Sequence, residues 1–462
     1  MRHAIFVALL AAGCGGAAPT QDPVKDVRET SEAYSTLYRL TSEVGHRLAG
    51  TENGKKAEEF ALARFREYGL ENVHAEPFDH LGWTRGETSF LLYEPRRKMD
   101  CHALGNTPTG TVDNEMVSAG HGTPDEVKAA GDTLKGKIVL VMSGAPKGHR
   151  GVHRMEKMAL LTKAGAAAMV LVNEPAGRII QTGTVAIGQI SRIPALGITR
   201  EDGEFLVGLI KDGKKPRGKL TVNAKSGNVT SRNIVGEIRG KELANEIVIL
   251  GAHLDSWDLA VGALDNGVGT AVVLETARAI MASGIGKPKR TIRFVLFMAE
   301  ELGLLGSKAY VKAHEKELGS IVMMINLDMV GKPKGFHLYA CDEAVEFFRG
   351  IAGKAGVEKV ECKAGLHSDH QPFMLAGVAA MTLQAPLDDD QGKYYHSDGD
   401  HFGRVKKEQL DACAKVTVAT VLEIASVAKR PTVWLTKDAT RERMERDEVK
   451  EALQLAGEWP FE

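Results

Sequence analysis

The chain has 462 residues, of which 43% are hydrophobic and 26% are charged. These values are typical of globular domains, so disorder, collagen or a coiled coil is excluded as the main organisation. The 59 Lys and Arg residues balance 60 Asp and Glu residues, so there is no basic excess of the kind that favours nucleic-acid binding. The length suggests two or three domains, or one large domain with an insertion.

The N-terminus has the pattern of an export signal. Met1-Arg2-His3 precedes the apolar run 4–12, which is shorter than the ~20 residues that span a bilayer. We therefore expect a signal peptide over residues 1–13. The small residues before Cys14 resemble a bacterial lipobox, which predicts a lipid anchor at Cys14 and a flexible tether over residues 14–29. Two alternatives are a plain secretory signal and an apolar N-terminus that is never cleaved.

The first part of the main domain is predicted over residues 30–104. The segment 26–43 has a helical pattern, and a loop over residues 44–51 follows it. Thr51 is placed to cap a second helix over residues 55–68, where apolar residues lie on one side. This pattern predicts helices that pack beside a sheet.

Residues 105–228 differ in character and are predicted to form an inserted domain. Strands are expected at 136–142, 165–172 and 193–198, with helices at 155–164 and 200–211. This segment holds no cluster of His, Asp and Glu of the kind that binds metals. The strings GKIVLV, GAAAMVLVN and IPALGIT resemble the protease-associated domain. We interpret the segment as a lid or as a module that shapes a substrate site.

Strands and helices alternate again over residues 229–428, the second part of the main domain. Strands are expected at 233–238, 246–251, 291–297, 321–326 and 379–383, with a helix at 267–283. Apolar strands of this length between helices predict a mostly parallel, buried sheet. The fold class is therefore α/β, with helices flanking the sheet and a smaller inserted domain. The charged tail, residues 429–462, is predicted to contain a surface helix over 438–455.

Polar side chains follow the predicted strands, where open α/β sheets gather ligands. They are His253, Asp255, Asp265, Glu300, Glu301, Asp328 and His396. Two imidazoles and three carboxylates are a mixed set that suits Zn²⁺ or a similar divalent ion and leaves two carboxylates spare. Five ligands also match a pair of ions ~3.5–4 Å apart that share one carboxylate. In an extended segment Asp255 lies on the same face as His253 and can support that imidazole.

Each of these residues also has a purely structural interpretation. Asp265 is placed to cap the helix that begins at Gly267. Glu300 and Glu301 are an acidic pair of the kind that a helix N-terminus favours. Tyr394 and Tyr395, which precede His396, are ordinary packing residues on this view. Most of the 15 His are expected to be surface or core residues.

Five strings in order resemble the M28 family of zinc peptidases: GAHLDSWD, GALDNGVGTA, FMAEELGLLGS, NLDMVG and YYHSDGD. The resemblance covers about residues 30–428 and includes the string GHRLAGTENGKKAEEFALARFREYGL near the start. It is strongest with the branch that contains plasma glutamate carboxypeptidase and bacterial aminopeptidases with an inserted protease-associated domain. It implies a zinc-exopeptidase fold and a metallopeptidase of the aminopeptidase or dipeptidase type.

The resemblance also implies a role for each site residue. It places one zinc ion on His253 and Asp328, the other on Glu301 and His396, and makes Asp265 the bridge. Glu300 is then the general base, and Asp255 orients His253. Either Tyr394 or Tyr395 is placed to stabilise the oxyanion. The loop His367-Ser368-Asp369-His370 also matches that branch and is expected near the substrate pocket, without a role as a ligand.

The function expected from these residues is an exported di-zinc exopeptidase that acts on dipeptides or on the N-terminus of short peptides. Alternatives are a carboxypeptidase, a glutaminyl-cyclase-like transferase of the same fold, and a non-catalytic surface binding protein. Zn²⁺, Co²⁺ and Mn²⁺ can share such ligands, so the native metal stays open. The expected partners are peptide substrates, a membrane reached only through the lipid anchor at Cys14, and by resemblance a second copy of the chain. The disulfide pairing of Cys101, Cys341, Cys362 and Cys413 also stays open.

Overall fold

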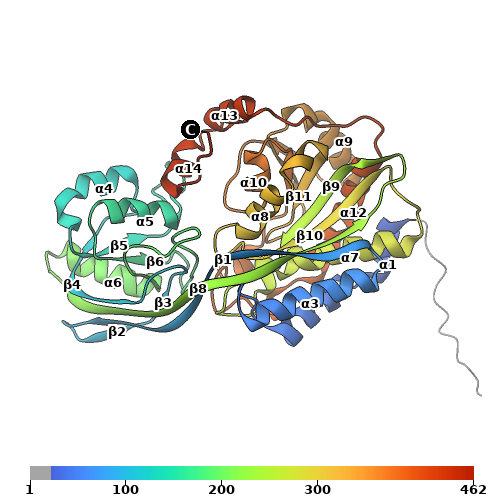
Figure 1. The fold of residues 1–462 in the computed structure, drawn as a ribbon. Helices are drawn as coiled ribbons and strands as arrows, with labels where there is room; N and C mark the ends of the chain where they lie inside the picture. Colours follow the sequence, from blue (N-terminus) through green and yellow to red (C-terminus); the bar gives the residue numbers. More distant parts are fainter. Residues whose placement is uncertain (1–21, 462) are drawn as a thin grey trace, which may run out of the picture.

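The computed structural model describes residues 22–461. The predicted signal peptide, Cys14 and most of the predicted tether lie outside these residues. Within them, no helix is long and apolar enough to cross a membrane, and Cys101, Cys341, Cys362 and Cys413 are free thiols. The protein has two lobes that are joined by two long strands, with the C-terminal segment passing between them (Figure 1).

The larger lobe contains both ends of the described chain. Its first helices are α1 (Pro23–Thr30), α2 (Ala33–Arg39), the π-helical turn η1 (Leu40–Val44) and α3 (Glu52–Glu67). The single helix expected over 26–43 is therefore wrong, because Ser31 has an extended backbone that ends α1. The predicted Thr51 cap is confirmed, since its side chain accepts a hydrogen bond from the Gly54 N–H.

The two long strands cross from one lobe to the other. They are β1 (Glu71–Leu92) and β8 (Arg217–Ile238), which pair antiparallel from Glu71 opposite Glu237 to Leu92 opposite Gly218 (Figure 1). The sequence does not predict the length of these strands. Their pattern of buried and exposed residues changes along the strand, so no single alternation runs through it. The predicted boundary at residue 228 falls inside β8.

The central sheet of the large lobe is parallel in its middle, as the sequence predicts. Its strands lie in the order β13-β12-β14-β11-β9-β10-β8, and β14, β11, β9 and β10 run parallel to their neighbours within this group. The bounds are β9 (Leu243–His253), β10 (Arg290–Phe297), β11 (Ile321–Asn326), β12 (Gly335–Tyr339), β13 (Lys359–Cys362) and β14 (Ala380–Gln384). Antiparallel pairing occurs at β8 with β10 and at β12 with β14.

Alternate side chains of β9 pack into different cores, which is the two-residue period of a buried strand. Val248 and Leu250 join the core beneath α7 and α12, whereas Ile247 and Ile249 join the core beneath α8 and α10. The helices of this lobe are α7 (Val268–Ser283), α8 (Leu305–Ala313), α9 (Val345–Ala355), α10 (His370–Leu375), α11 (Asp389–Gly392) and α12 (Lys407–Ser426). Its short turns are η3 (Ala263–Gly267), η4 (Glu315–Ser320), η5 (Asp342–Ala344) and η6 (Phe402–Arg404).

The smaller lobe contains the segment predicted as an insertion. Its strands are β2 (Arg97–Met99), β3 (Cys101–Ala103), β4 (Gly110–Ser118), β5 (Ile138–Met142), β6 (Ala168–Val172) and β7 (Ala195–Ile198). Its helices are α4 (Pro124–Ala130), the turn η2 (Gly131–Leu134), α5 (Arg154–Lys163) and α6 (Arg200–Lys211). The strands and helices predicted from the sequence here are thus present with small shifts at their ends. Below, this lobe is called the insert.

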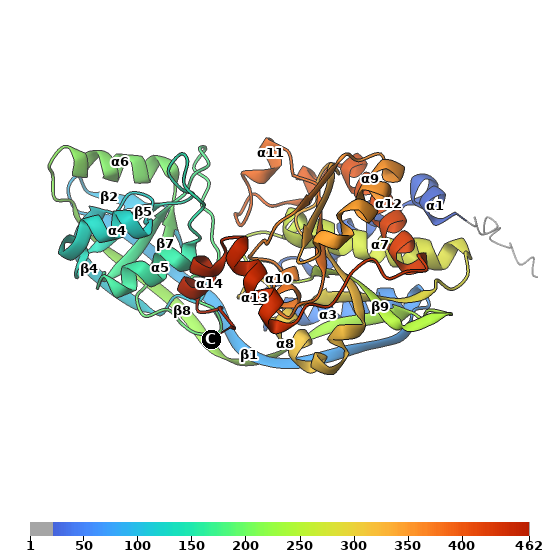
Figure 2. The same cartoon turned by 90° about the horizontal axis from the view of Figure 1, so that it is seen from above.

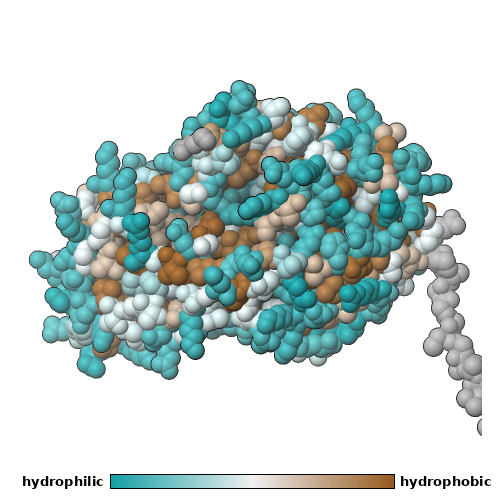
Figure 3. Space-filling view, viewed as in Figure 1, coloured by the Kyte–Doolittle hydropathy of each residue, from teal (hydrophilic) through white to brown (hydrophobic). Residues whose placement is uncertain are grey.

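The C-terminal segment bridges the two lobes. It forms two helices, α13 (Lys437–Arg446) and α14 (Lys450–Ala456), and not the single surface helix that the sequence predicts. Glu448 between them has a positive φ, which breaks the helical path. Met444 is buried against the large lobe, and α14 packs on α5 of the insert (Figure 2). Apolar side chains gather in the middle of the face that Figure 3 shows, where the lobes meet.

Candidate metal centre

Loops at the carboxyl ends of the central parallel strands carry the site residues. His253 is the last residue of β9, Glu300 and Glu301 follow β10, and Asp328 follows β11. Because these ends meet at one edge of the sheet, side chains far apart in sequence converge there. Asp265 enters from the turn before α7, and His396 from the loop after α11.

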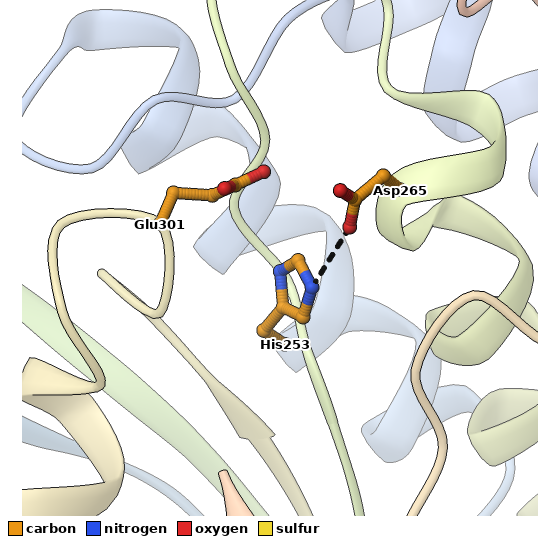
Figure 4. Close-up of side chains that lie close together, drawn as sticks. All are labelled: His253, Asp265 and Glu301. Carbon is orange, nitrogen blue, oxygen red and sulfur yellow. Dashed lines mark ion pairs between the residues drawn. The ribbon is translucent and has the colours of Figure 1, made fainter. Parts of the chain in front are cut away.

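Asp265 lies between the two imidazoles. Its Oδ1 is 3.1 Å from His253 Nε2 and its Oδ2 is 3.0 Å from His396 Nε2. His253 Nε2 is also 3.3 Å from Asp328 Oδ1, and His396 Nε2 is 2.9 Å from Glu301 Oε2. The five residues therefore form two groups, each of one imidazole and two carboxylates, that share Asp265. One possible ligand atom each from His253, Asp265 and Glu301 lies within 4.8 Å of the others (Figure 4).

Both imidazoles direct Nε2 toward the carboxylates because Nδ1 faces a backbone carbonyl. His253 Nδ1 is 3.1 Å from the carbonyl oxygen of Asp255, and His396 Nδ1 is 3.4 Å from that of Thr182. A carbonyl can only accept, so Nδ1 is the donor and Nε2 is left with its lone pair. Such a contact fixes the tautomer that binds metals.

The residues fit a divalent metal ion. Lone pairs of imidazole nitrogen and carboxylate oxygen converge within 3.3 Å, and a cation between them relieves their repulsion. One oxygen of Glu301 and one of Asp328 are buried with no hydrogen-bond partner, which leaves both free to bind metal. Nitrogen and carboxylate ligands without Cys suit Zn²⁺ in an open site.

Asp255 fixes the two acidic residues as well as the imidazole. Its carboxylate accepts hydrogen bonds from the backbone N–H groups of Glu300 at 3.1 Å and Glu301 at 3.3 Å. Its Oδ1 is 3.7 Å from His253 Nδ1, so the carbonyl of Asp255 is the nearer support for that ring. Burial, together with the charges of Asp328 and Glu301, raises the pKa of Glu300 well above its usual range.

Comparison with known proteins identifies the family. The model of peptidase family M28 matches residues 233–421, and that of the PA domain matches residues 106–206. Carboxypeptidase Q of Bos taurus is 31% identical over 415 residues, which cover 86% of each chain. The chain belongs to peptidase family M28.

Solved structures of M28 peptidases share its fold. An M28 peptidase precursor from Shewanella amazonensis is 27% identical, with a TM-score of 0.78 over 90% of this chain and 98% of that one. The zinc aminopeptidase BSAP from Bacillus subtilis is 30% identical, with a TM-score of 0.66 over 87% and 97% of the two chains. The protein is therefore a metallopeptidase with an α/β fold and an inserted PA domain.

Three residues that sequence reasoning passed over hold the loops of this peptidase. Asn266 donates to the carbonyl of Leu327 at 2.7 Å and accepts from the N–H of Met329 at 3.2 Å, which ties the Asp265 loop to the Asp328 loop. Asp400 accepts hydrogen bonds from the backbone of the Asp265 loop. Arg47 is fully buried and donates to the carbonyls of Leu254, Val261 and Gly262 at 2.6–2.8 Å.

These three residues give only a weak signal in the sequence. Arg47 lies in the string GHRLAG and Asp400 ends YYHSDGD, so both stand inside the quoted motifs. Nothing in a one-dimensional pattern distinguishes a side chain that binds metal from one that binds backbone. The distinction depends on which atoms face the centre.

The loop at residues 367–370 supports the centre without joining it. Ser368 donates to Asp328 Oδ2 at 2.6 Å and accepts from the side chain of Asn326 at 2.7 Å. His367 lines the pocket that also contains Glu300. His370 instead stacks on Tyr339 at a ring distance of 4.1 Å, inside the core.

The two tyrosines before His396 lie in different surroundings. Tyr395 lines the pocket with Glu300 and stacks on His396 at a ring distance of 3.6 Å. Tyr394 is stacked against the Arg404 guanidinium, 3.3 Å from its ring centre, and lies outside the pockets that hold Glu300. Burial raises the pKa of Tyr395, so its hydroxyl remains a donor at neutral pH. Tyr395 is the better placed of the two for an oxyanion.

The insert contacts the metal centre directly. The Thr182 N–H donates to the carbonyl of His396 at 2.9 Å, and the Gln181 side chain donates to the carbonyl of Tyr395 at 3.0 Å. Arg85, on the β1 strand, pairs with Asp258 of the large lobe at 2.8 Å and also donates to Thr182. The insert thus holds the segment that carries His396.

Proposed function

We propose that this M28 peptidase is an exported di-zinc exopeptidase that cleaves dipeptides or removes the N-terminal residue of short peptides. The observation that carries the proposal is the place of Asp265, whose two oxygens face His253 and His396 at 3.1 and 3.0 Å. A carboxylate that faces one imidazole with each of its oxygens is placed to be a ligand shared by two ions. The name of the Bacillus subtilis neighbour supports zinc as the metal.

On this proposal His253 and Asp328 would hold one ion, His396 and Glu301 would hold the other, and Asp265 would be shared by both. When bound, zinc polarises the peptide carbonyl and lowers the pKa of water to near neutrality. Glu300 lies in the same pocket as Glu301 and His396 but takes no part in either group of ligands. It is therefore free to accept a proton from the attacking water and to return it to the leaving amine.

Fixed geometry supports this role for Glu300. Its backbone N–H is held by Asp255, which also supports His253, so the base and the metal ligand share one anchor. A base held at one place in the pocket can take a proton from the attacking water and return it to the leaving amine. Tyr395 adds a hydroxyl donor in the same pocket for the developing oxyanion.

The decisive experiment compares free dipeptides with the same dipeptides acetylated at the amine, with products followed by mass spectrometry. Cleavage of only the free-amine forms supports the proposal. Equal cleavage of blocked forms supports the second candidate, a carboxypeptidase, which the name of the Bos taurus relative favours. The zinc content of the same preparations is also measured. Two zinc ions per chain are expected, and Asp265→Asn should lower the occupancy of both sites.

The part of the proposal that concerns export rests on the sequence alone. The charged start, the apolar run 4–12 and the small residues before Cys14 support a lipid anchor, and a plain secretory signal is the alternative. Radiolabelled palmitate tests the difference in a bacterial host. Label on the wild-type protein and none on Cys14→Ser supports the anchor, whereas export of both without label supports plain secretion.

A further inference from the structure

Two of the four described thiols lie at the carboxyl ends of neighbouring strands. The β12 and β13 strands pair parallel at one edge of the central sheet, with Leu338 opposite Cys362. Cys362 is the last residue of β13, and Cys341 lies two residues beyond the end of β12. Adjacent strands lie about 4.8 Å apart, so groups at their ends can come within reach of a disulfide, which joins Cα atoms about 4.4–6.8 Å apart.

The backbone on both sides of this cysteine pair is fixed by hydrogen bonds. Ala340 has φ +56, which takes the chain out of the path of β12. Cys341 then begins the turn η5, and its carbonyl accepts from the Ala344 N–H at 3.0 Å. On the other strand, the Lys363 N–H donates to the carbonyl of Leu338 at 3.1 Å, so β13 keeps its place beside β12 past Cys362.

The two thiols contact each other at this corner of the sheet. The side chains of Cys341 and Cys362 share a hydrogen bond, and the backbone N–H of Cys341 donates to the sulfur of Cys362. The carboxylate of Asp342, the next residue, is also hydrogen-bonded to the Cys362 thiol. Cys362 therefore faces the turn that carries Cys341 through three separate contacts.

The pair consists of one buried thiol and one that solvent reaches. Cys341 is fully buried, whereas Cys362 is half-buried. The hydrogen bond with Cys341 lowers the pKa of Cys362, and the same bond, together with burial, raises the pKa of Cys341 well above its usual range. Because the thiolate is the nucleophile in disulfide exchange, Cys362 is the thiol that reacts first.

The other two described cysteines have different surroundings. Cys101 lies on β3 in the insert, opposite Ile198, and burial raises its pKa to about 12. Cys413 is buried in α12, where its thiol donates to the carbonyl of Gly331 at 2.8 Å. Among the residues that the structure describes, no hydrogen bond joins either of them to another thiol.

We propose that Cys341 and Cys362 form a disulfide in an oxidising compartment, whereas Cys101 and Cys413 stay reduced. The Cys362 thiolate attacks one sulfur of a small disulfide such as oxidised glutathione, which forms a mixed disulfide and releases one glutathione thiolate. Cys341 then gives its proton to water and attacks the Cys362 sulfur, which releases the second glutathione thiolate. Two protein thiols are thereby oxidised, and their two electrons reduce the small disulfide to two thiols.

The bond would fix the turn to which the C-terminal segment is attached. Asp342 in η5 forms ion pairs with Arg443 and Arg446 of α13, and α13 leads to the helix that packs on the insert. A link between Cys341 and Cys362 ties this turn to β13 and closes a loop around α9. Such a loop restricts the unfolded chain, so the bond stabilises the large lobe.

The test incubates the purified full chain with oxidised glutathione, blocks the remaining thiols with N-ethylmaleimide under denaturing conditions, and maps peptides by mass spectrometry without reduction. We expect a peptide pair joined through Cys341 and Cys362, with the label on Cys101 and Cys413. Cys362→Ser should abolish the joined pair. Cys101→Ser is the matched control, since it also removes a partly buried thiol, and it should leave the joined pair unchanged.

Thermal unfolding provides a second measurement on the same samples. Reduction with dithiothreitol should lower the melting temperature of the oxidised wild type by about 5 °C and leave that of Cys362→Ser unchanged. Label on both Cys341 and Cys362 after oxidation, or a bond from either to another cysteine, would overturn the pairing. An unchanged melting temperature on reduction of the joined protein would overturn its stabilising role. Neither measurement depends on peptide cleavage or on export, so both decide this inference even if the proposed function is wrong.

Discussion

The carboxylate of Asp400 accepts a hydrogen bond from the backbone N–H of Asp265 at 3.0 Å. Its other oxygen accepts from the N–H of Leu264 at 2.7 Å, and all of these groups are buried. Asp400 thus fixes the loop that points the carboxylate of Asp265 at the two imidazoles. Residues that orient ligands in this way affect metal affinity nearly as strongly as the ligands.

Asp400→Asn should weaken zinc binding by about 10- to 100-fold, because an amide offers one acceptor where the carboxylate offers two. It should also destabilise the fold by about 1–3 kcal/mol, since one buried N–H loses its partner. Chelator competition and chemical denaturation of the metal-free protein measure the two effects. Asp398→Asn, an exposed neighbour in the same loop, is the control and should change neither. Unchanged zinc affinity in Asp400→Asn would contradict this role.

Glu300→Gln should lower kcat by about 10²- to 10⁴-fold, because the amide can neither accept nor return the proton. Zinc content should stay at the wild-type level, since Glu300 takes no part in either group of ligands. Glu301→Gln is the matched comparison and should lose metal as well as activity, because its oxygen lies 2.9 Å from His396 Nε2. Turnover and elemental analysis on the same preparations distinguish the loss of the base from the loss of metal. A fully active Glu300→Gln enzyme would rule out the base.

Tyr395→Phe should lower kcat by about 10- to 100-fold if its hydroxyl stabilises the oxyanion. Tyr394→Phe removes the same atom from the adjacent residue and keeps its ring on Arg404, so its activity should equal that of the wild type. Steady-state kinetics on one free dipeptide decides between them. Equal effects of both substitutions would mean that Tyr395 only packs against His396.

His314 should stabilise the protein in a pH-dependent way. Burial opposes its charge, but hydrogen bonds with Glu317 and Glu76 raise its pKa to about 9. A raised His pKa contributes stability that is full below the unfolded value near 6.5 and is lost as pH rises through about 9. His314→Gln should therefore cost about 1–3 kcal/mol at pH 6 and much less at pH 10.

Urea denaturation of wild type and His314→Gln at both pH values makes this comparison. His149→Gln removes an exposed imidazole from the insert and should have no effect at either pH. The loss of unfolding free energy in His314→Gln could instead be the same at pH 6 and pH 10. That result would show that His314 contributes only by packing on Tyr310, whose ring centre lies 4.1 Å away.

Local patterns predicted the elements whose burial is uniform. The strands at 291–297 and 321–326 and the helix at 200–211 stand in the structure within a residue of their predicted bounds. The two strands are buried along almost their whole length, and the helix has one apolar face, so the hydrophobic pattern and the length agree in each. The same reasoning did not predict the length of β1 and β8, because each crosses from one lobe to the other and its burial changes along the way.

The sequence by itself determined the family, the parallel centre of the sheet and the residues offered as metal ligands, because these follow from residue type and from strand ends. Only the tertiary structure decided which groups hold these residues in place. Arg47, Asn266 and Asp400 act through hydrogen bonds between segments far apart in the chain, and no local spacing encodes such partners. The same holds for the contact of Thr182, in the insert, with the backbone of His396. These residues lie far apart in the sequence, so only the folded chain brings them together.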